Sequence, residues 1–127
     1  MGKQHSPGFL ALVNAAKSRI PELSVADVMA MMDRGDAIHL IDVREESEWA
    51  AGRIQGAVHL GKGTIERDVE QQFSDKSAVL VLYCGGGFRS ALAADALHQM
   101  GYTHAVSMDG GWRGWSTAKG PIDGGVD

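Results

Sequence analysis

Cysteine, proline and aromatic residues are scarce in this 127-residue chain, which has one cysteine, three prolines and 6% aromatic residues. A single cysteine cannot form a disulfide within the chain, so the fold must depend on its hydrophobic core. This pattern is typical of a reducing compartment, and we expect a cytoplasmic protein. The longest apolar run, residues 78–83, is far shorter than the roughly 20 residues that span a bilayer. The first residues also lack the basic and apolar segments of a signal peptide.

Clusters of basic residues are lacking as well. The formal net charge is −4, and no run of lysines and arginines is present to neutralise a row of phosphates. Neither nucleic acid nor an anionic membrane surface is therefore an expected partner. The five histidines show no paired spacing of the kind that binds zinc, and no Gly-Lys-Ser/Thr motif follows the glycine run. We expect no metal and no cofactor.

The chain does contain a regular succession of strand-like and helix-like segments, and its length fits one domain. Strands are predicted at residues 37–41, 57–60, 78–83 and 105–108. Helices are predicted at residues 9–20, 25–34, 45–51, 65–73 and 92–100, with Ser24 as an N-cap and Gly35 and Gly101 as C-terminal ends. Strands that alternate with helices predict an α/β fold with a mainly parallel central sheet and helices on both faces.

The two ends of the chain differ in composition from its middle. Residues 1–20 are predicted to form an N-terminal extension, loose over residues 1–8 and then helical. Residues 21–118 are predicted to form the single domain. Residues 119–127 are rich in glycine and aspartate and are predicted to form a flexible C-terminal tail.

Cys84 stands out because of what surrounds it. It follows the strand at residues 78–83 and precedes three glycines, Gly85 to Gly87. In open α/β sheets, sites form outside the carboxyl ends of the strands, and the N–H groups of such a turn attract an anion. A thiolate placed there has a lowered pKa and is nucleophilic near neutral pH. A lone cysteine after an apolar strand is more often a small buried side chain, but the glycines and the positive charge of Arg89 favour a nucleophile.

Three segments together resemble one known family. Residues 83–91 (YCGGGFRSA) contain a six-residue loop that starts at a cysteine and closes with an arginine before a serine. Residues 40–45 (LIDVRE) begin a second signature that continues to His59, and Gly110-Gly111 with Trp115 forms a third. In this order and spacing, from about residue 24 to residue 115, they are similar to the rhodanese-like domain family. The resemblance implies a single rhodanese-like domain.

The resemblance also implies an activity and a set of roles. Cys84 would take a sulfane sulfur from a donor such as thiosulfate and then pass it from a persulfide to cyanide or to a thiol, including a cysteine of a partner protein. The residues implied to bind the sulfur donor are Gly85, Gly86, Gly87, Phe88, Arg89 and Ser90. Asp42 and Arg44 are implied to hold the loop and the neighbouring segments. The alternative for these two residues is an exposed ion pair of little consequence.

The loop departs from the family pattern directly after the cysteine. Many single-domain relatives carry an arginine or another polar residue there, whereas this chain has Gly85 and Gly86. Arg89 is then the only side-chain cation of the loop, which favours a persulfide or protein donor over thiosulfate. No second cysteine is present to resolve the persulfide, so an external acceptor must discharge it. Phe88 is predicted to be exposed and to shape the surface where that acceptor docks.

Two other functions remain open on the sequence. Phosphatases and arsenate reductases also use a cysteine, a loop of N–H groups and an arginine, but with five residues between the cysteine and the arginine. Here only residues 85–88 lie between Cys84 and Arg89, and the narrower loop suits one sulfur atom better than a tetrahedral phosphate. A non-catalytic interaction module is the second alternative, although such domains commonly lose the nucleophile that this chain retains.

Overall fold

The computed structural model describes residues 5–124 of the chain. The strands are β1 (Glu22–Leu23), β2 (Ile38–Asp42), β3 (Arg53–Ile54), β4 (Val58–His59), β5 (Val79–Tyr83), β6 (Ala105–Met108) and β7 (Ile122–Asp123). The helices are α1 (Pro7–Lys17), α2 (Val25–Asp33), α3 (Glu46–Ala51), α4 (Ile65–Gln72), α5 (Phe88–Gln99) and α6 (Gly111–Thr117). Five strands form a parallel central sheet in the order β1-β6-β5-β2-β4, and β3 pairs with β7 in a separate antiparallel sheet.

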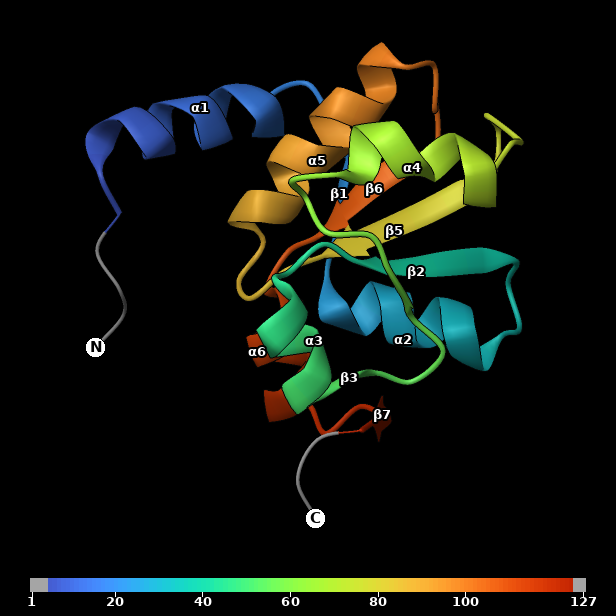
Figure 1. Cartoon of the computed structure of the whole chain (residues 1–127). Helices are drawn as coiled ribbons and strands as arrows, with labels where there is room; N and C mark the ends of the chain where they lie inside the picture. The colour runs from blue at the N-terminus through green and yellow to red at the C-terminus, as the bar shows by residue number, and fades with distance from the viewer. Residues whose placement is uncertain (1–4, 125–127) are drawn as a thin grey trace.

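Helices cover both faces of the central sheet, which confirms the predicted α/β fold. In Figure 1, α4 and α5 lie on one face and α2 and α6 on the other, with α1 packed beside α5. The side chains of β5 alternate between the two layers, because successive residues of a strand point to opposite faces. Leu80 and Leu82 join the core beneath α4 and α5, whereas Val81 and Tyr83 join the core beneath α2 and α6. A strand that is apolar on both faces therefore occupies the middle of the sheet.

The register of the sheet places the carboxyl-terminal ends of β2 and β5, which carry two of the sequence motifs, side by side. β2 pairs with β5 so that Asp42 lies opposite Tyr83. Cys84 follows β5 and Arg44 follows β2, so both reach the same carboxyl-terminal edge of the sheet. This is the edge at which parallel α/β sheets place their sites.

The structure shifts several predicted boundaries by a few residues. The first helix begins at Pro7, since proline at the first helical position costs no backbone hydrogen bond, and it ends at Lys17. Residues 7 and 8 are thus helical where a loose segment was predicted. At α2, Ser24 accepts a hydrogen bond from the Asp27 N–H and Asp27 accepts one from the Ser24 N–H, so the predicted cap is confirmed as a reciprocal capping box.

The described part of the segment after residue 118, for which a flexible tail is predicted, makes contacts with the rest of the chain. Ile122 pairs with Ile54 between β7 and β3, and the indole N–H of Trp115 donates to the Pro121 carbonyl at 3.0 Å. These are contacts with residues distant in the chain, and local composition does not reveal them. The predictions for residues 1–4 and 125–127 fall outside the described residues.

The described helices are too short or too polar to span a membrane. Within residues 5–124, no helix combines the length and the apolar character needed to cross a bilayer.

Candidate active site

The loop after β5 encloses the Cys84 side chain. Cys84 is only 1% exposed, and α5 starts at Phe88. Gly87 has a φ of 108°, in the left-handed region that favours glycine, and a Cβ there would lie 3.3 Å from Oδ1 of Asp109. The glycine therefore permits both the turn and its close approach to the segment after β6.

Hydrogen-bond donors converge on the sulfur atom. The N–H groups of Gly87 and Ser90 lie 3.1 and 3.4 Å from Sγ of Cys84, and the Ser90 hydroxyl lies 3.5 Å from it. Ser90 Oγ is also 2.8 Å from Oγ of Ser107. When Sγ is a thiolate it can only accept, so Ser90 donates to it and Ser107 donates to Ser90. The buried hydroxyl pair extends the row of backbone donors predicted from the glycines.

The two opposing influences on the thiol are burial and these hydrogen bonds. Burial is the largest single influence and raises the pKa of Cys84. The hydrogen bonds from Ser90, Gly87 and Gly86 together outweigh it, so the pKa lies below the ordinary value of a thiol. A lowered pKa is the property expected of a nucleophilic cysteine rather than of an inert apolar side chain.

Arg89 closes the loop through an ion pair that the sequence reading missed. Its guanidinium donates to both carboxylate oxygens of Glu48 at 2.7 and 3.1 Å, which joins α5 to α3. The hydrogen bond from Arg89 lowers the pKa of Glu48 to about 2. The positive charge of Arg89 is therefore largely balanced by Glu48. Glu48 belongs to the second signature, and its position there is the only sequence signal for a role.

Asp42 and Arg44 form a buried pair, which excludes the exposed ion pair considered above. Nε and Nη2 of Arg44 donate to the Asp42 carboxylate at 3.0 and 2.8 Å, and Nη2 also donates to the Gly52 carbonyl. The Tyr83 hydroxyl donates to Asp42 at 2.7 Å and accepts from the Ile54 N–H at 3.1 Å. This network joins β2, β5 and the segment from α3 to β3, and it reaches the loop through Tyr83, the residue before Cys84.

The first turn of α6 packs directly on the Cys84 loop. The Trp112 N–H donates to the Cys84 carbonyl at 2.7 Å, and the Arg113 N–H donates to the Gly85 carbonyl at 3.1 Å. Gly111 has a φ of 52°, and a Cβ there would overlap the Cys84 carbonyl. The third signature, Gly110-Gly111, thus allows α6 to hold the backbone of the loop.

Arg113 brings a second guanidinium to the loop, for which Arg89 was predicted to be the only side-chain cation. A Cβ on Gly86 would overlap the Arg113 guanidinium. A Cβ on Gly85 would lie 3.2 Å from Nη2 of Arg89 and 3.3 Å from Nη1 of Arg113. Arg113 carries no motif signal and lies far from Cys84 in the chain, so only the fold reveals it.

Phe88 lies against the N-terminal segment and is half-buried, so it is less exposed than predicted. Its ring centroid is 4.8 Å from that of His5 and 6.2 Å from that of Phe9, and Nζ of Lys17 lies 5.3 Å from it. His5 and α1 therefore cover part of this ring. That Phe88 shapes a docking surface for the acceptor stays a prediction.

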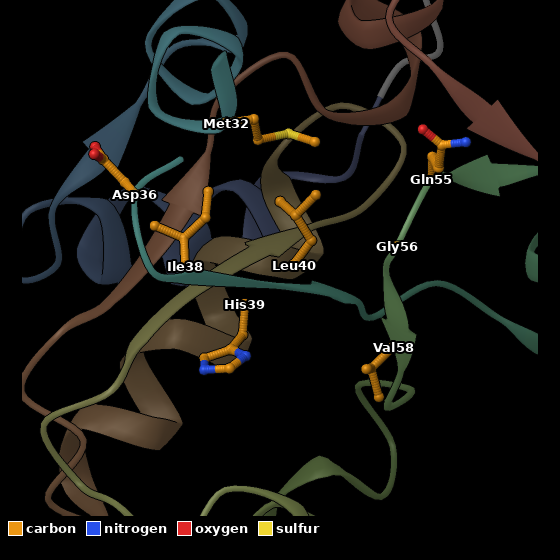
Figure 2. A pocket seen from close by; sticks show the side chains of 8 residues that line it. All are labelled: Met32, Asp36, Ile38, His39, Leu40, Gln55, Gly56 and Val58. Atoms are coloured by element: carbon orange, nitrogen blue, oxygen red, sulfur yellow. The ribbon is translucent and has the colours of Figure 1, made fainter. Parts of the chain in front are cut away.

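One pocket in the described part of the chain lies away from Cys84. A pocket of about 300 Å³ lies where β2 begins, between Met32, Leu40 and Gly56 (Figure 2). Because β2 and β5 are parallel, this pocket is at the opposite end of the strands from Cys84. Its carboxylate, Asp36, is paired with Arg34. Across residues 5–124, no group of three or more His, Cys, Asp or Glu side chains is placed to hold a metal ion.

Comparisons with known proteins agree with the geometry. The chain is 33% identical over 102 residues to "Putative sulfurtransferase YtwF" of Bacillus subtilis, covering 80% of this chain and 96% of that protein. It is 29% identical to "Thiosulfate sulfurtransferase GlpE" of Pseudoalteromonas translucida, covering 76% of this chain and 89% of that protein. A solved structure from Rhodopseudomonas palustris, described as a protein of unknown function and "Possible Tyrosine Phosphatase", is 31% identical with a TM-score of 0.84, covering 97% of this chain and 99% of that one.

A family model shows which part of the chain belongs to a known family. The model for the rhodanese-like domain matches residues 24–118, which include both strand-end motifs and all of α6. The parallel sheet, the cysteine loop after β5 and the sulfurtransferase-named relatives agree with that match. The chain belongs to the rhodanese-like domain family.

Proposed function

We propose that this protein is a sulfurtransferase that carries a sulfane sulfur on Cys84 as a persulfide. The observation that supports this most is the set of donors around Sγ: the Gly87 N–H, the Ser90 N–H and the Ser90 hydroxyl. As hydrogen-bond donors they favour the thiolate before the reaction, and they can stabilise the anionic outer sulfur of the persulfide after it. The relatives named as sulfurtransferases support the same reaction class.

The first half-reaction loads Cys84. The thiolate attacks the outer sulfur of thiosulfate, the S–S bond of thiosulfate breaks, and its electron pair leaves with sulfite. A small persulfide RSS⁻ reacts in the same way and releases the thiolate RS⁻. Either reaction leaves a Cys84 persulfide anion, with no net oxidation and no proton consumed.

The second half-reaction unloads the persulfide. A nucleophile such as cyanide or a thiolate attacks the outer sulfur, the new S–S bond breaks, and the Cys84 thiolate returns with the electron pair. Cys84 is the only cysteine of the chain, so the accepting thiol belongs to another molecule, either small or a partner protein. The products are thiocyanate or a new persulfide.

Phosphatase chemistry is the competing function. The description of the R. palustris structure mentions it, and the cysteine–arginine loop has the same parts. The spacing of the loop favours sulfur transfer, because only residues 85–88 lie between Cys84 and Arg89 and the narrower loop suits one sulfur atom better than a tetrahedral phosphate. Arg89 is also engaged by Glu48, whereas a phosphatase needs this arginine for the phosphate.

Mass spectrometry of the intact protein tests the proposal. The wild-type protein and Cys84→Ser are treated separately with thiosulfate and with a small alkyl persulfide, and p-nitrophenyl phosphate turnover is measured in parallel. We expect wild type to gain one sulfur atom and to return it to cyanide as thiocyanate, and we expect the serine variant to gain none. Absence of added sulfur with both donors contradicts the proposal, and hydrolysis of the phosphate ester that depends on Cys84 favours the phosphatase.

A further inference from the structure

Two guanidinium groups flank the turn that follows Cys84. Nη2 of Arg89 and Nη1 of Arg113 lie on the side of Gly85 where a Cβ would stand, at 3.2 and 3.3 Å from its position. The Arg113 guanidinium also occupies the space that a Cβ of Gly86 would need. Any side chain at residue 86 would displace Arg113, so the two glycines and this arginine fit one another.

Arg113 is held in this place by its own backbone. Its N–H donates to the Gly85 carbonyl at 3.1 Å, and the preceding N–H, that of Trp112, donates to the Cys84 carbonyl at 2.7 Å. The position of the Arg113 Cα is therefore tied to the loop that carries the nucleophile. The backbone of Arg113 is thus fixed relative to the loop, while its side chain is exposed to solvent.

The charges around the loop differ in how far they are already balanced. Arg44 is paired with the buried carboxylate of Asp42, and Arg89 is paired with Glu48 through two hydrogen bonds. Among residues 5–124, the guanidinium of Arg113 forms no ion pair and no side-chain hydrogen bond. Of the three arginines, Arg113 is thus the one whose positive charge and N–H donors are available to a ligand.

We infer that Arg113 binds the oxyanion group of a thiosulfate-type sulfur donor and so determines donor specificity. This inference rests on the proposed function. Sγ of Cys84 is buried, so the sulfane sulfur of the donor must enter the loop while the rest of the donor stays at its outer side, where Arg113 lies. A planar guanidinium can donate two hydrogen bonds to two oxygens of one sulfonate group.

The same contact also serves the chemical step. When the S–S bond of thiosulfate breaks, the electron pair goes to the departing sulfite, and an adjacent cation stabilises the charge that develops there. Arg113 thereby supplies from α6 a positive charge that Gly85 and Gly86 of the loop cannot supply. The loop glycines then favour an oxyanion donor, whereas on the sequence alone they favoured a persulfide or protein donor.

Donor kinetics test this assignment. The variants are Arg113→Ala, Arg113→Lys and a matched control, Arg67→Ala, which removes an exposed guanidinium of α4. The donors are thiosulfate and 2-hydroxyethyl persulfide, which carries no oxyanion group, and thiocyanate formation is the readout. For Arg113→Ala we expect the KM for thiosulfate to rise about ten-fold or more, as for loss of a hydrogen bond between charged groups, while the KM for the persulfide changes less than about two-fold. Arg113→Lys should recover part of the loss, and Arg67→Ala should match wild type.

A binding measurement separates failure of this inference from failure of the proposed function. Thiosulfate is titrated calorimetrically into Cys84→Ser and into Cys84→Ser with Arg113→Ala, neither of which can react. Binding that weakens about ten-fold without Arg113 supports the inference even if wild type proves inactive. Equal thiosulfate KM values, equal binding in the two serine proteins, or neither binding nor turnover of thiosulfate each overturn it. In each of these cases persulfide turnover by wild type still upholds the proposed function.

Discussion

At the scale of single residues, the state of Cys84 depends on a balance between burial and donated hydrogen bonds. A buried thiol ordinarily keeps its proton, because a charge loses its hydration there. The hydrogen bonds of Ser90, with those of Gly87 and Gly86, reverse this and lower the pKa of Cys84. Ser90 matters twice, through its N–H and through its hydroxyl, which Ser107 orients.

Replacing Ser90 by alanine should move the titration of Cys84 toward higher pH. The variant keeps the backbone donor but loses the hydroxyl, so the thiolate is less favoured and the pKa of Cys84 rises. Alkylation by iodoacetamide, measured against pH, should then be several-fold slower than wild type near neutral pH and should converge with it at alkaline pH. Ser116→Ala, at an exposed position of α6, is the control. An unshifted profile for Ser90→Ala would show that the backbone N–H groups alone set the pKa.

At the scale of elements, the approach of α6 to the Cys84 loop depends on the absence of a side chain at residue 111. The helix donates two backbone hydrogen bonds to the loop, from Trp112 and Arg113, and it brings the Arg113 side chain with it. A Cβ at Gly111 would meet the Cys84 carbonyl and the Gly85 backbone, neither of which can move without moving the nucleophile.

Gly111→Ala should therefore lower both stability and activity. We expect a loss of about 3 kcal/mol or more in the free energy of unfolding, because overpacking adds to the cost of a positive φ. Gly101→Ala is the matched control: it also has a positive φ, of 99°, but open space where the Cβ would stand, so it should cost about 1 kcal/mol and keep activity. Urea denaturation and thiosulfate turnover measure the two effects, and equal losses in both variants would contradict the proposed contact.

At the scale of the whole molecule, the buried pair of Asp42 and Arg44 connects parts of the chain that are distant in sequence. The pair lies beneath the loop, with Tyr83 bonded to Asp42 from β5 and the Gly52 carbonyl bonded to Arg44 from the end of α3. The central sheet and the segment leading to β3 are therefore joined through one charged network. Its value to the fold depends on keeping both charges, since either one alone would be buried without a partner.

Arg44→Ala should destabilise the molecule by about 3–5 kcal/mol, because it leaves the Asp42 carboxylate buried and unpaired. Asp42→Ala combined with Arg44→Ala should cost less than the sum of the two single changes, since no lone charge remains. Arg67→Ala breaks the exposed pair with Asp68 and should cost less than about 1 kcal/mol. Urea midpoints at constant m-value provide the comparison, and additive losses for the double variant would show that the pair is not coupled.

What the sequence determined by itself is local. The strand before Cys84, the glycines after it and the helix start at Phe88 occupy one continuous stretch, so the placing of Cys84 and of its backbone donors follows from neighbouring residues. The capping box at Ser24 and the apolar strand β5 are predictable for the same reason. Exposure and pairing are not local properties, so the contacts of Phe88 with His5 and Phe9 and the pairing of Ile122 with Ile54 could not be predicted from neighbouring residues.

Only the tertiary structure decided which charges the loop can use. Arg89 reads as a free cation in the sequence, but the fold places Glu48 against it, whereas Arg113 carries no motif and the fold brings it over Gly86. Each of these contacts joins elements that are far apart in the chain, and their geometry depends on how α3 and α6 pack at the edge of the sheet. The sulfur chemistry proposed for Cys84 thus rests on consecutive residues, whereas the cation proposed to bind its donor depends on packing between distant ones.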